Sequence, residues 1–187
     1  VSGSRVLLAG SSWPQDEKLV HALLSGKHGR GIKVIIAPHE VHEERIRDIL
    51  SAFALHNPIR YSQAGDHKLS ASKVLVIDGM GFLSSLYQYC DAALIGGGFG
   101  KGIHNILEAV TFGKPVLFGP NYEKFAEARQ LVEKGGAFPV DENNFVDLVN
   151  QLLDDAAFYG QASETCRNYI NENTGATRII LDNLEIR

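Results

Sequence analysis

Cysteines are scarce in this sequence, and long apolar runs and an excess of basic residues are missing from it. The two cysteines, Cys90 and Cys166, provide no disulfide framework and suit a reducing cytosol. No apolar run approaches the ~18 residues of a membrane-spanning helix, and no signal peptide opens the chain. These absences argue against a disulfide-stapled secreted domain, and we expect this domain to be soluble by itself.

The charge balance is mildly acidic. With 18 Lys and Arg against 22 Asp and Glu, the net charge is −4 and the isoelectric point is about 6.0. No basic stripe is available to neutralise phosphates, so we expect no nucleic-acid partner. The 187 residues, 44% of them hydrophobic, suffice for one globular domain with a sizeable core. Because the chain begins at Val1 and not at a methionine, we expect it to be a piece of a longer protein.

Apolar runs alternate with helix-like segments along the chain. The runs that predict strands are Arg5–Ala9, Lys33–Ala37, Ile59–Tyr61, Lys73–Ile77, Ala92–Ile95, Pro115–Phe118 and Ala137–Val140. The segments that predict helices are Gln15–Leu24, Val41–Ala54, Phe82–Tyr89, Asn105–Phe112 and Phe125–Lys134. A further predicted helix is capped by Asp141 and reaches Leu153. The polar segment Gln63–Ser72 predicts a loop. This alternation predicts an α/β fold, a Rossmann-like parallel sheet of about six strands with helices on both faces. We expect this core over about residues 1–155 and C-terminal helices over about 156–187, all within one domain, 1–187.

The loops that follow the predicted strands are rich in Gly, Ser, His, Asp or Asn. In sheets of this kind, ligands bind beyond the carboxyl ends of the strands. We therefore expect these loops to converge on one cleft. They are Gly10–Pro14, Pro38–Glu40, Asp78–Gly81, Gly96–Gly102 and Gly119–Phe125.

A glycine cluster follows Ile95. Glycines let the backbone adopt positive φ and let a ligand approach the main chain closely. A helix that opens after such a loop directs unpaired N–H groups and its positive dipole end at the ligand, which favours an anion such as phosphate. Polar side chains on the first helical turns favour a binding site over a plain tight turn. The residues concerned are the glycines Gly96, Gly97, Gly98, Gly100 and Gly102 and the polar residues His104, Asn105 and Glu108.

Three sets of motifs carry a resemblance to a known family. They are His104-Asn105-x-x-Glu108 with Gly119-Pro120-Asn121-Tyr122-x-x-Phe125, Asp78-Gly79-Met80-Gly81-Phe82-Leu83 with Leu86-Tyr87 and Asp91, and Ser11-Ser12-Trp13-Pro14-x-Asp16-Glu17. Together they resemble the Kdo (3-deoxy-D-manno-octulosonic acid) transferases of lipopolysaccharide assembly, which are GT-B glycosyltransferases that move Kdo from CMP-Kdo onto a lipid A precursor. The resemblance covers essentially the whole chain, but only the C-terminal, donor-binding half of the family's protein.

The sequence departs from the family's pattern at four places. Gly79 replaces Thr, Phe82 replaces Glu, and Trp13 stands where His is usual. The Arg that the family usually has between Pro38 and His39 is missing. Phe82 begins a predicted helix, and the other departures fall in the loops that are expected to contact the donor.

The resemblance implies that the chain binds CMP-Kdo, a co-substrate, and needs no cofactor. His39 and His42 are three apart with no third ligand nearby, so we expect no metal. The implied reaction is an inverting transfer whose general base, a carboxylate, lies in the N-terminal half, so we expect no catalytic residue in this chain. We expect the full protein to meet the lipid A precursor and the inner-membrane surface through that half, at the cytoplasmic face of the bacterial inner membrane. By the same resemblance, the last predicted helix, Ala176–Leu184, should pack away from the sheet toward the missing half.

Several of the candidate residues have a structural alternative. The resemblance implies that the Glu108 carboxylate accepts hydrogen bonds from two ribose hydroxyls, and the alternative is a surface charge. For Asn105 the two alternatives are binding the phosphate and capping the helix. For Met80 they are a place beside a phosphate-binding N–H group and filling of the core. His39 and Lys101 bind the donor or are solvated. The donor-binding candidates are Ser11, Ser12, His39, Met80, Gly81, Gly97, Gly98, Lys101, His104, Asn105 and Glu108.

Two other functional classes stay open at this point. A UDP-sugar transferase or a sugar-nucleotide epimerase would share the fold and the ribose-binding Glu108. A non-catalytic nucleotide-binding module would need no transfer chemistry at all. The local contexts of Asn121-Tyr122 and Met80-Gly81 favour the Kdo transferases.

Overall fold

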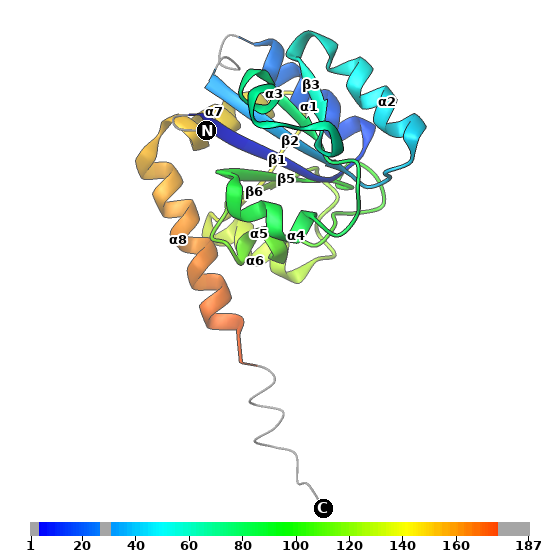
Figure 1. Ribbon diagram of the computed structural model, residues 1–187. Coiled ribbons are helices and arrows are strands. Elements are labelled where there is room, and N and C mark those ends of the chain that lie inside the picture. Colours follow the sequence, from blue (N-terminus) through cyan, green and yellow to red (C-terminus); the bar gives the residue numbers. More distant parts are fainter. Residues whose placement is uncertain (1–3, 27–30, 176–187) are drawn as a thin grey trace, which may run out of the picture.

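The computed structural model describes residues 4–26 and 31–175, and these residues form one seven-stranded parallel sheet between two layers of helices (Figure 1). The strands are β1 (Arg5–Ser12), β2 (Ile32–Pro38), β3 (Pro58–Arg60), β4 (Val74–Val76), β5 (Ala92–Ile95), β6 (Val116–Phe118) and β7 (Ala137–Pro139). The predicted Rossmann-like fold is confirmed. The sheet has seven strands rather than about six, because each of the seven apolar runs pairs with a neighbour.

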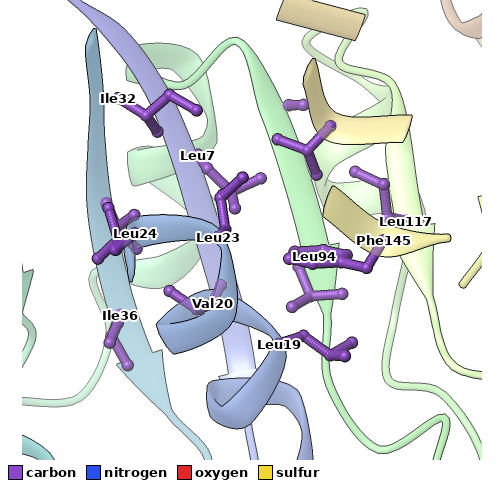
Figure 2. Close-up of a cluster of buried hydrophobic side chains, with 14 of the residues drawn as sticks. Leu7, Leu19, Val20, Leu23, Leu24, Ile32, Ile36, Leu94, Leu117 and Phe145 are labelled. Carbon is purple, nitrogen blue, oxygen red and sulfur yellow. The ribbon is translucent and has the colours of Figure 1, made fainter. Parts of the chain in front are cut away.

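Alternating side chains along the strands supply two cores, one on each face of the sheet. Leu7 and Ala9 of β1 join the core on one face, whereas Leu8 joins the core on the other face. Figure 2 shows Leu7 beside the apolar side of the first helix, where Val20 and Leu23 are fully buried. Three helices cover the core that contains Leu7: α1 (Pro14–Ser25), α2 (Glu43–Ala52) and α7 (Phe145–Asp154). The second core involves α5 (Leu107–Val110), α6 (Ala126–Lys134), α8 (Ala156–Asn173) and the 3-10 turn η4 (Tyr87–Tyr89) that follows α4 (Leu83–Leu86).

The chain changes direction across the sheet at β1. The order of the strands in space is β3-β4-β2-β1-β5-β6-β7, so β2 to β4 lie on one side of β1 and β5 to β7 on the other. The carboxyl ends of β1 and β5 therefore lie at the point where the strand order reverses. In open parallel sheets this is where ligands bind.

Three local predictions are corrected by the structure. The predicted loop Gln63–Ser72 contains a short helix, α3 (Asp66–Ala71), which belongs to the crossover between the parallel strands β3 and β4. The helix after the glycine loop spans only Leu107–Val110, because the chain closes into a turn that ends at Gly113 with φ of 66°. The last core helix begins at Phe145, and Asp141 instead accepts hydrogen bonds from the N–H groups of a preceding turn.

The described C-terminal part of the chain is the single helix α8 (Ala156–Asn173). α8 begins right after Asp155, whose carboxylate accepts hydrogen bonds from the N–H groups of Ala157 and Phe158, each at 3.0 Å. The further helix predicted at Ala176–Leu184 lies outside the described residues. Within residues 4–26 and 31–175, no helix is both long enough and apolar enough to cross a membrane.

Candidate functional site

Three aromatic rings from three different loops stack where the strand order reverses. Trp13 follows β1, His39 follows β2 and His104 lies in the loop after β5. The His39 ring stacks against both of the others, with centroids 4.8 Å from Trp13 and 4.5 Å from His104. The Trp13 indole Nε1 also donates a hydrogen bond to Nε2 of His104 at 3.3 Å. Two predicted donor-binding residues and the tryptophan that replaces the family's histidine are thus brought together.

The hydrogen bond from Trp13 requires that Nε2 of His104 carry no proton. Burial, together with the neighbouring His39, lowers the pKa of the His104 imidazole below its ordinary value. At neutral pH the His104 ring therefore stays neutral and the bond to Trp13 is retained.

The glycine loop packs against main chain on both sides. The Gly96 N–H donates to the Gly10 carbonyl at 2.9 Å, and a Cβ on Gly96 would lie 2.0 Å from the Ser11 carbonyl oxygen. A Cβ on Gly98 would lie 2.5 Å from the backbone nitrogen of Gly119, in the loop after β6. Gly96 and Gly98 are therefore required by close backbone approach, which ties the loop to the ends of β1 and β6.

The end of β1 is irregular at Ser11. Gly10 pairs with Ala37 and Ser12 pairs with Pro38, so Ser11 is an extra residue in the ladder and adopts a φ of 51°. This left-handed conformation is strained for a serine and bends the chain toward α1. The structure thus gives Ser11 a main-chain role at the edge of the site.

Ser12 faces the protein interior. The residue is buried, and its hydroxyl donates to Oε1 of Glu17 at 2.9 Å. The same carboxylate oxygen accepts from Nη2 of Arg45 on α2, at 2.5 Å. The Glu17 side chain is 8% exposed and that of Arg45 is 14% exposed, so this ion pair is largely shielded from water. Ser12 is therefore positioned to hold the loop after β1 in place from the interior of the protein.

Asp16 connects two of the loops. Its Oδ2 accepts a hydrogen bond from the Trp13 N–H at 2.9 Å and another from the Gly97 N–H at 3.3 Å. Its other oxygen, Oδ1, is buried and has no partner among the described residues. Burial is the main reason that the pKa of this carboxyl rises to about 6.

A cavity of about 390 Å³ lies between the loop after β1 and the glycine loop. Aromatic side chains and glycine backbone make up much of its wall, and a few polar groups converge in it, as in many small-molecule sites. It is lined by Trp13, Gln15, Asp16, Gly97, Phe99, Gly100, Lys101, Gly102 and His104.

A smaller cavity of about 150 Å³ lies on the other side of His39. His39, Met80 and Gly81 line it together with residues that end β2 and follow β4. Met80 is 83% exposed, so the alternative that it fills the core is wrong. Gly81 has a φ of 86°, which a residue with a side chain rarely adopts.

Asn105 and Glu108 lie beside each other at the start of α5. The Asn105 amide Nδ2 is 3.3 Å from Oε1 of Glu108, and its Oδ1 accepts a hydrogen bond from the Leu107 N–H at 3.0 Å. Asn105 precedes Ile106, the N-cap residue of α5, and its side chain supports the start of the helix through the Leu107 N–H group. Burial and the nearby Glu108 carboxylate raise the pKa of the Tyr87 hydroxyl, which packs against Gly10 at the end of β1.

The loop after β6 holds the glycine loop in place. The Asn121 side chain donates to the Gly100 carbonyl at 2.8 Å, and Nζ of Lys124 donates to the Lys101 carbonyl at 2.6 Å. The Lys101 side chain is exposed and lines the 390 Å³ cavity. Two ammonium groups thus lie at one end of the glycine loop, where they would attract an anion.

The site contains residues that the sequence-based selection missed. Gln15, Asp16 and Phe99 line the main cavity, and Arg45 holds the carboxylate beneath it. Asp16 belongs to the Ser-Ser-Trp-Pro-x-Asp-Glu motif that carries part of the family resemblance. That membership is the sequence feature from which Asp16 could have been selected as a site residue. Among the described residues no group of three or more His, Cys, Asp or Glu side chains could hold a metal ion.

A cavity of about 540 Å³ lies at the opposite edge of the sheet and is larger than either of these. It is lined by residues at the amino ends of β1, β2 and β4, such as Val6, Lys33 and Leu75. Ligands of parallel α/β sheets bind at the carboxyl ends, so we assign the functional site to the smaller cavities there.

Comparisons with curated proteins confirm the resemblance inferred from the motifs. The chain is 27% identical over 150 residues, or 79% of its length, to the 3-deoxy-D-manno-octulosonic acid transferase of Rickettsia typhi. The match covers 32% of that protein, so the chain spans about a third of the length of the curated relatives it matches. No protein-family model matches the chain.

Solved structures support the fold. The C-terminal CMP-Kdo binding domain of WaaA from Acinetobacter baumannii superposes with a TM-score of 0.75 at 21% identity, covering 90% of each chain. The Anabaena protein HepE, crystallised with UDP-glucose, superposes with a TM-score of 0.66 at 14% identity, covering 97% of this chain and 48% of that one. Both likenesses show the GT-B-type α/β fold, and the fold alone does not select the nucleotide.

Proposed function

We propose that this chain is the CMP-Kdo-binding part of a Kdo transferase. The observation that carries the proposal is the sequence similarity to Kdo transferases over about four-fifths of the chain. Part of the motifs behind the resemblance also lines the two cavities at the carboxyl ends of the strands, namely Trp13, Asp16, His104, Met80 and Gly81. Sequence similarity and site position therefore agree.

In this proposal the chain binds the nucleotide and stabilises the negative charge of CMP as it departs. Lys101 and Lys124 lie at one end of the glycine loop, and the N–H groups of Gly98 and Phe99 donate no hydrogen bond within the described part of the chain. Preorganised donors and cations of this kind stabilise a leaving group without reorganising during the reaction. The half-buried Glu108 would accept hydrogen bonds from the ribose hydroxyls.

The remaining parts of the reaction would come from outside this chain. An acceptor hydroxyl attacks the anomeric carbon of Kdo, and the bond from that carbon to the CMP oxygen breaks, with inversion. We propose that the base that takes the acceptor's proton, the site for the lipid A precursor and the contact with the cytoplasmic face of the inner membrane all belong to the remainder of the protein. The chain studied by itself should then bind CMP without transferring Kdo.

Calorimetric titration of the chain with CMP, UMP and UDP tests the proposal. We expect CMP to bind best, with modest affinity, because the second domain that would complete the pocket is missing. A preference for UDP would favour a UDP-sugar transferase or epimerase. Failure to bind any nucleotide would refute the proposal, and Kdo transfer by the chain alone would refute the division of labour described above.

Replacing Glu108 with glutamine should weaken CMP binding about 5- to 30-fold. Glutamine keeps the size of the side chain but turns a charged hydrogen-bond acceptor into a neutral one, a loss of about 1–2 kcal/mol. The same calorimetric titration measures the effect. Glu133→Gln, an exposed residue on α6, is the matched control and should leave CMP affinity unchanged. Equal affinities of wild type and Glu108→Gln would remove Glu108 from the ribose site.

A further inference from the structure

The Asp16 carboxyl group is only half satisfied. Only 1% of the residue is exposed, and its Oδ2 is occupied by the N–H groups of Trp13 and Gly97. Oδ1 has no partner among the described residues, although Asp16 lines the 390 Å³ cavity. A buried oxygen of this kind is costly unless something in the cavity bonds to it. The geometry therefore points to a ligand atom opposite Oδ1.

The charges around the cavity determine what kind of atom this is. Lys101 is the ammonium group that lines the cavity, and an ionised Asp16 would cancel its charge. Glu17, next along α1, adds a second carboxylate nearby, but Arg45 of α2 neutralises it. His104 lines the cavity as a neutral ring, and His39 stacks behind it. Lys124 adds a second ammonium group at the end of the glycine loop. An ionised Asp16 would therefore weaken, by one unit charge, the positive potential that an entering anion meets.

We propose that an oxyanion of the donor occupies this cavity and that Asp16 takes up a proton from solvent as it binds. The proton resides on Oδ1 and is donated to the oxyanion, while Oδ2 keeps its two N–H bonds. The oxyanion is either the nucleotide phosphate or the carboxylate of the sugar acid. Asp16 is in this view a positioning residue for the donor, and the inference rests on the function proposed above.

Protonation of Asp16 requires little free energy in this environment. Burial already holds the pKa of the carboxyl at about 6 in the free protein, against an ordinary value of 3.8. An adjacent anion raises the pKa further, so binding takes up a proton and affinity must fall as pH rises. Between pH 6 and pH 8 the protonated fraction of free Asp16 falls from about one half to about one hundredth. The affinity for the oxyanion should therefore fall by up to about 50-fold over this range.

Asp16→Asn separates this mechanism from its alternatives. Asparagine keeps an oxygen that can accept from Trp13 and Gly97, and its amide donates permanently where protonated Asp16 would donate. We expect this variant to bind free Kdo with less than a threefold change in affinity between pH 6 and 8, and at pH 8 more tightly than wild type. Asp48→Asn, an exposed position on α2, is the matched control and should behave as wild type.

The test is calorimetry at pH 7.5 in two buffers of different ionisation enthalpy, with CMP and with free Kdo as separate ligands. The carboxylate of Kdo does not titrate near this pH, so proton uptake by the wild-type protein is informative even if Asp16→Asn fails to fold. Close to one proton per Kdo identifies the sugar carboxylate as the oxyanion. Extra uptake with CMP over that of Asp16→Asn identifies the phosphate instead.

The outcomes separate the two proposals. If neither ligand takes up the proton on binding, or if Asp16→Asn binds at least 10-fold more weakly than wild type at pH 8, the inference about Asp16 is wrong and the proposed function stands. Weaker binding by Asp16→Asn would mean that an ionised carboxylate accepts a ligand hydroxyl. If neither CMP nor Kdo binds at any pH, both proposals are wrong.

Discussion

Gly96→Ala should destabilise the domain by about 3 kcal/mol and abolish nucleotide binding. A Cβ at this position would lie 2.0 Å from the carbonyl oxygen of Ser11 and 2.9 Å from Cα of Ser12. Both contacts are with main chain, so no side-chain rotation can relieve them, and the end of β1 would have to move away from β5. Overpacking of this kind costs about 1–3 kcal/mol and occasionally more, and a backbone obstacle places the effect at the upper end. Thermal unfolding should show a melting temperature about 6–12 °C lower for a domain of this size.

Gly160→Ala provides a control of opposite sign. Gly160 lies within α8, and a Cβ there would meet nothing within 4 Å. Alanine favours the helix over glycine by roughly 0.5–1 kcal/mol, so the melting temperature should rise by about 1–4 °C. If Gly96→Ala were as harmless as Gly160→Ala, the close approach of β5 to the end of β1 would be refuted.

Replacing Arg45 with methionine should destabilise the domain about as much as Gly96→Ala does. Arg45→Met leaves the Glu17 carboxylate largely buried, and among the described residues the Ser12 hydroxyl is then its remaining hydrogen-bond donor. Leaving one member of a buried ion pair without its partner costs about 3–5 kcal/mol. Because Arg45 is 14% exposed and water can partly replace it, we expect about 3 kcal/mol in urea denaturation. Nucleotide binding should weaken as well, because Ser12 and Glu17 support the loop after β1.

The double variant Glu17→Gln/Arg45→Met tests the cause of this loss. With both charges removed, stability should return to within about 1.5 kcal/mol of wild type, since no uncompensated charge stays buried. Arg47→Met is the matched control on the same helix. Arg47 and its partner Glu43 are 67% and 61% exposed, so this change should cost less than about 0.5 kcal/mol. Similar losses for Arg45→Met and Arg47→Met would show that the Glu17–Arg45 pair is not buried in solution.

The strands were predictable because parallel strands are covered on both faces. Such strands are short continuous apolar runs, and the run Ala92–Ile95 became β5 without change. The six-residue helix α3 was missed because Asp66–Ala71 is polar and too short to show a helical period of apolar residues. The length of helix α5 was overestimated, because no residue before Gly113 marks the turn that ends the helix.

The glycines of the site were predictable, whereas the side chains that support them were not. Gly96, Gly97 and Gly98 are required by backbone geometry, which a glycine cluster after a strand indicates directly. The role of Asp16 depends on Gly97, 81 residues away, and that of Glu17 depends on Arg45, 28 residues away. In sequence, two acidic residues in the first turn of a helix look like ordinary partners of the helix dipole. Only the fold shows that one of them bridges two loops and that the other is paired beneath them.

The central position of β1 has a consequence for how the protein folds. The strands β1 to β4 are neighbours within the first 76 residues, and β5 to β7 are neighbours within residues 92–139, so each group can form through contacts that are close in sequence. The strands of the two groups pair with each other at β1 and β5, where Leu7 pairs with Ala92. Pairing of β1 with β5 closes the long stretch of chain between them, which costs more conformational entropy than pairing strands within either group. The joint between the two groups should therefore form late in folding. Since the ligand loops lie on both sides of that joint, a newly synthesised chain acquires its binding site only when the two halves of the sheet have come together.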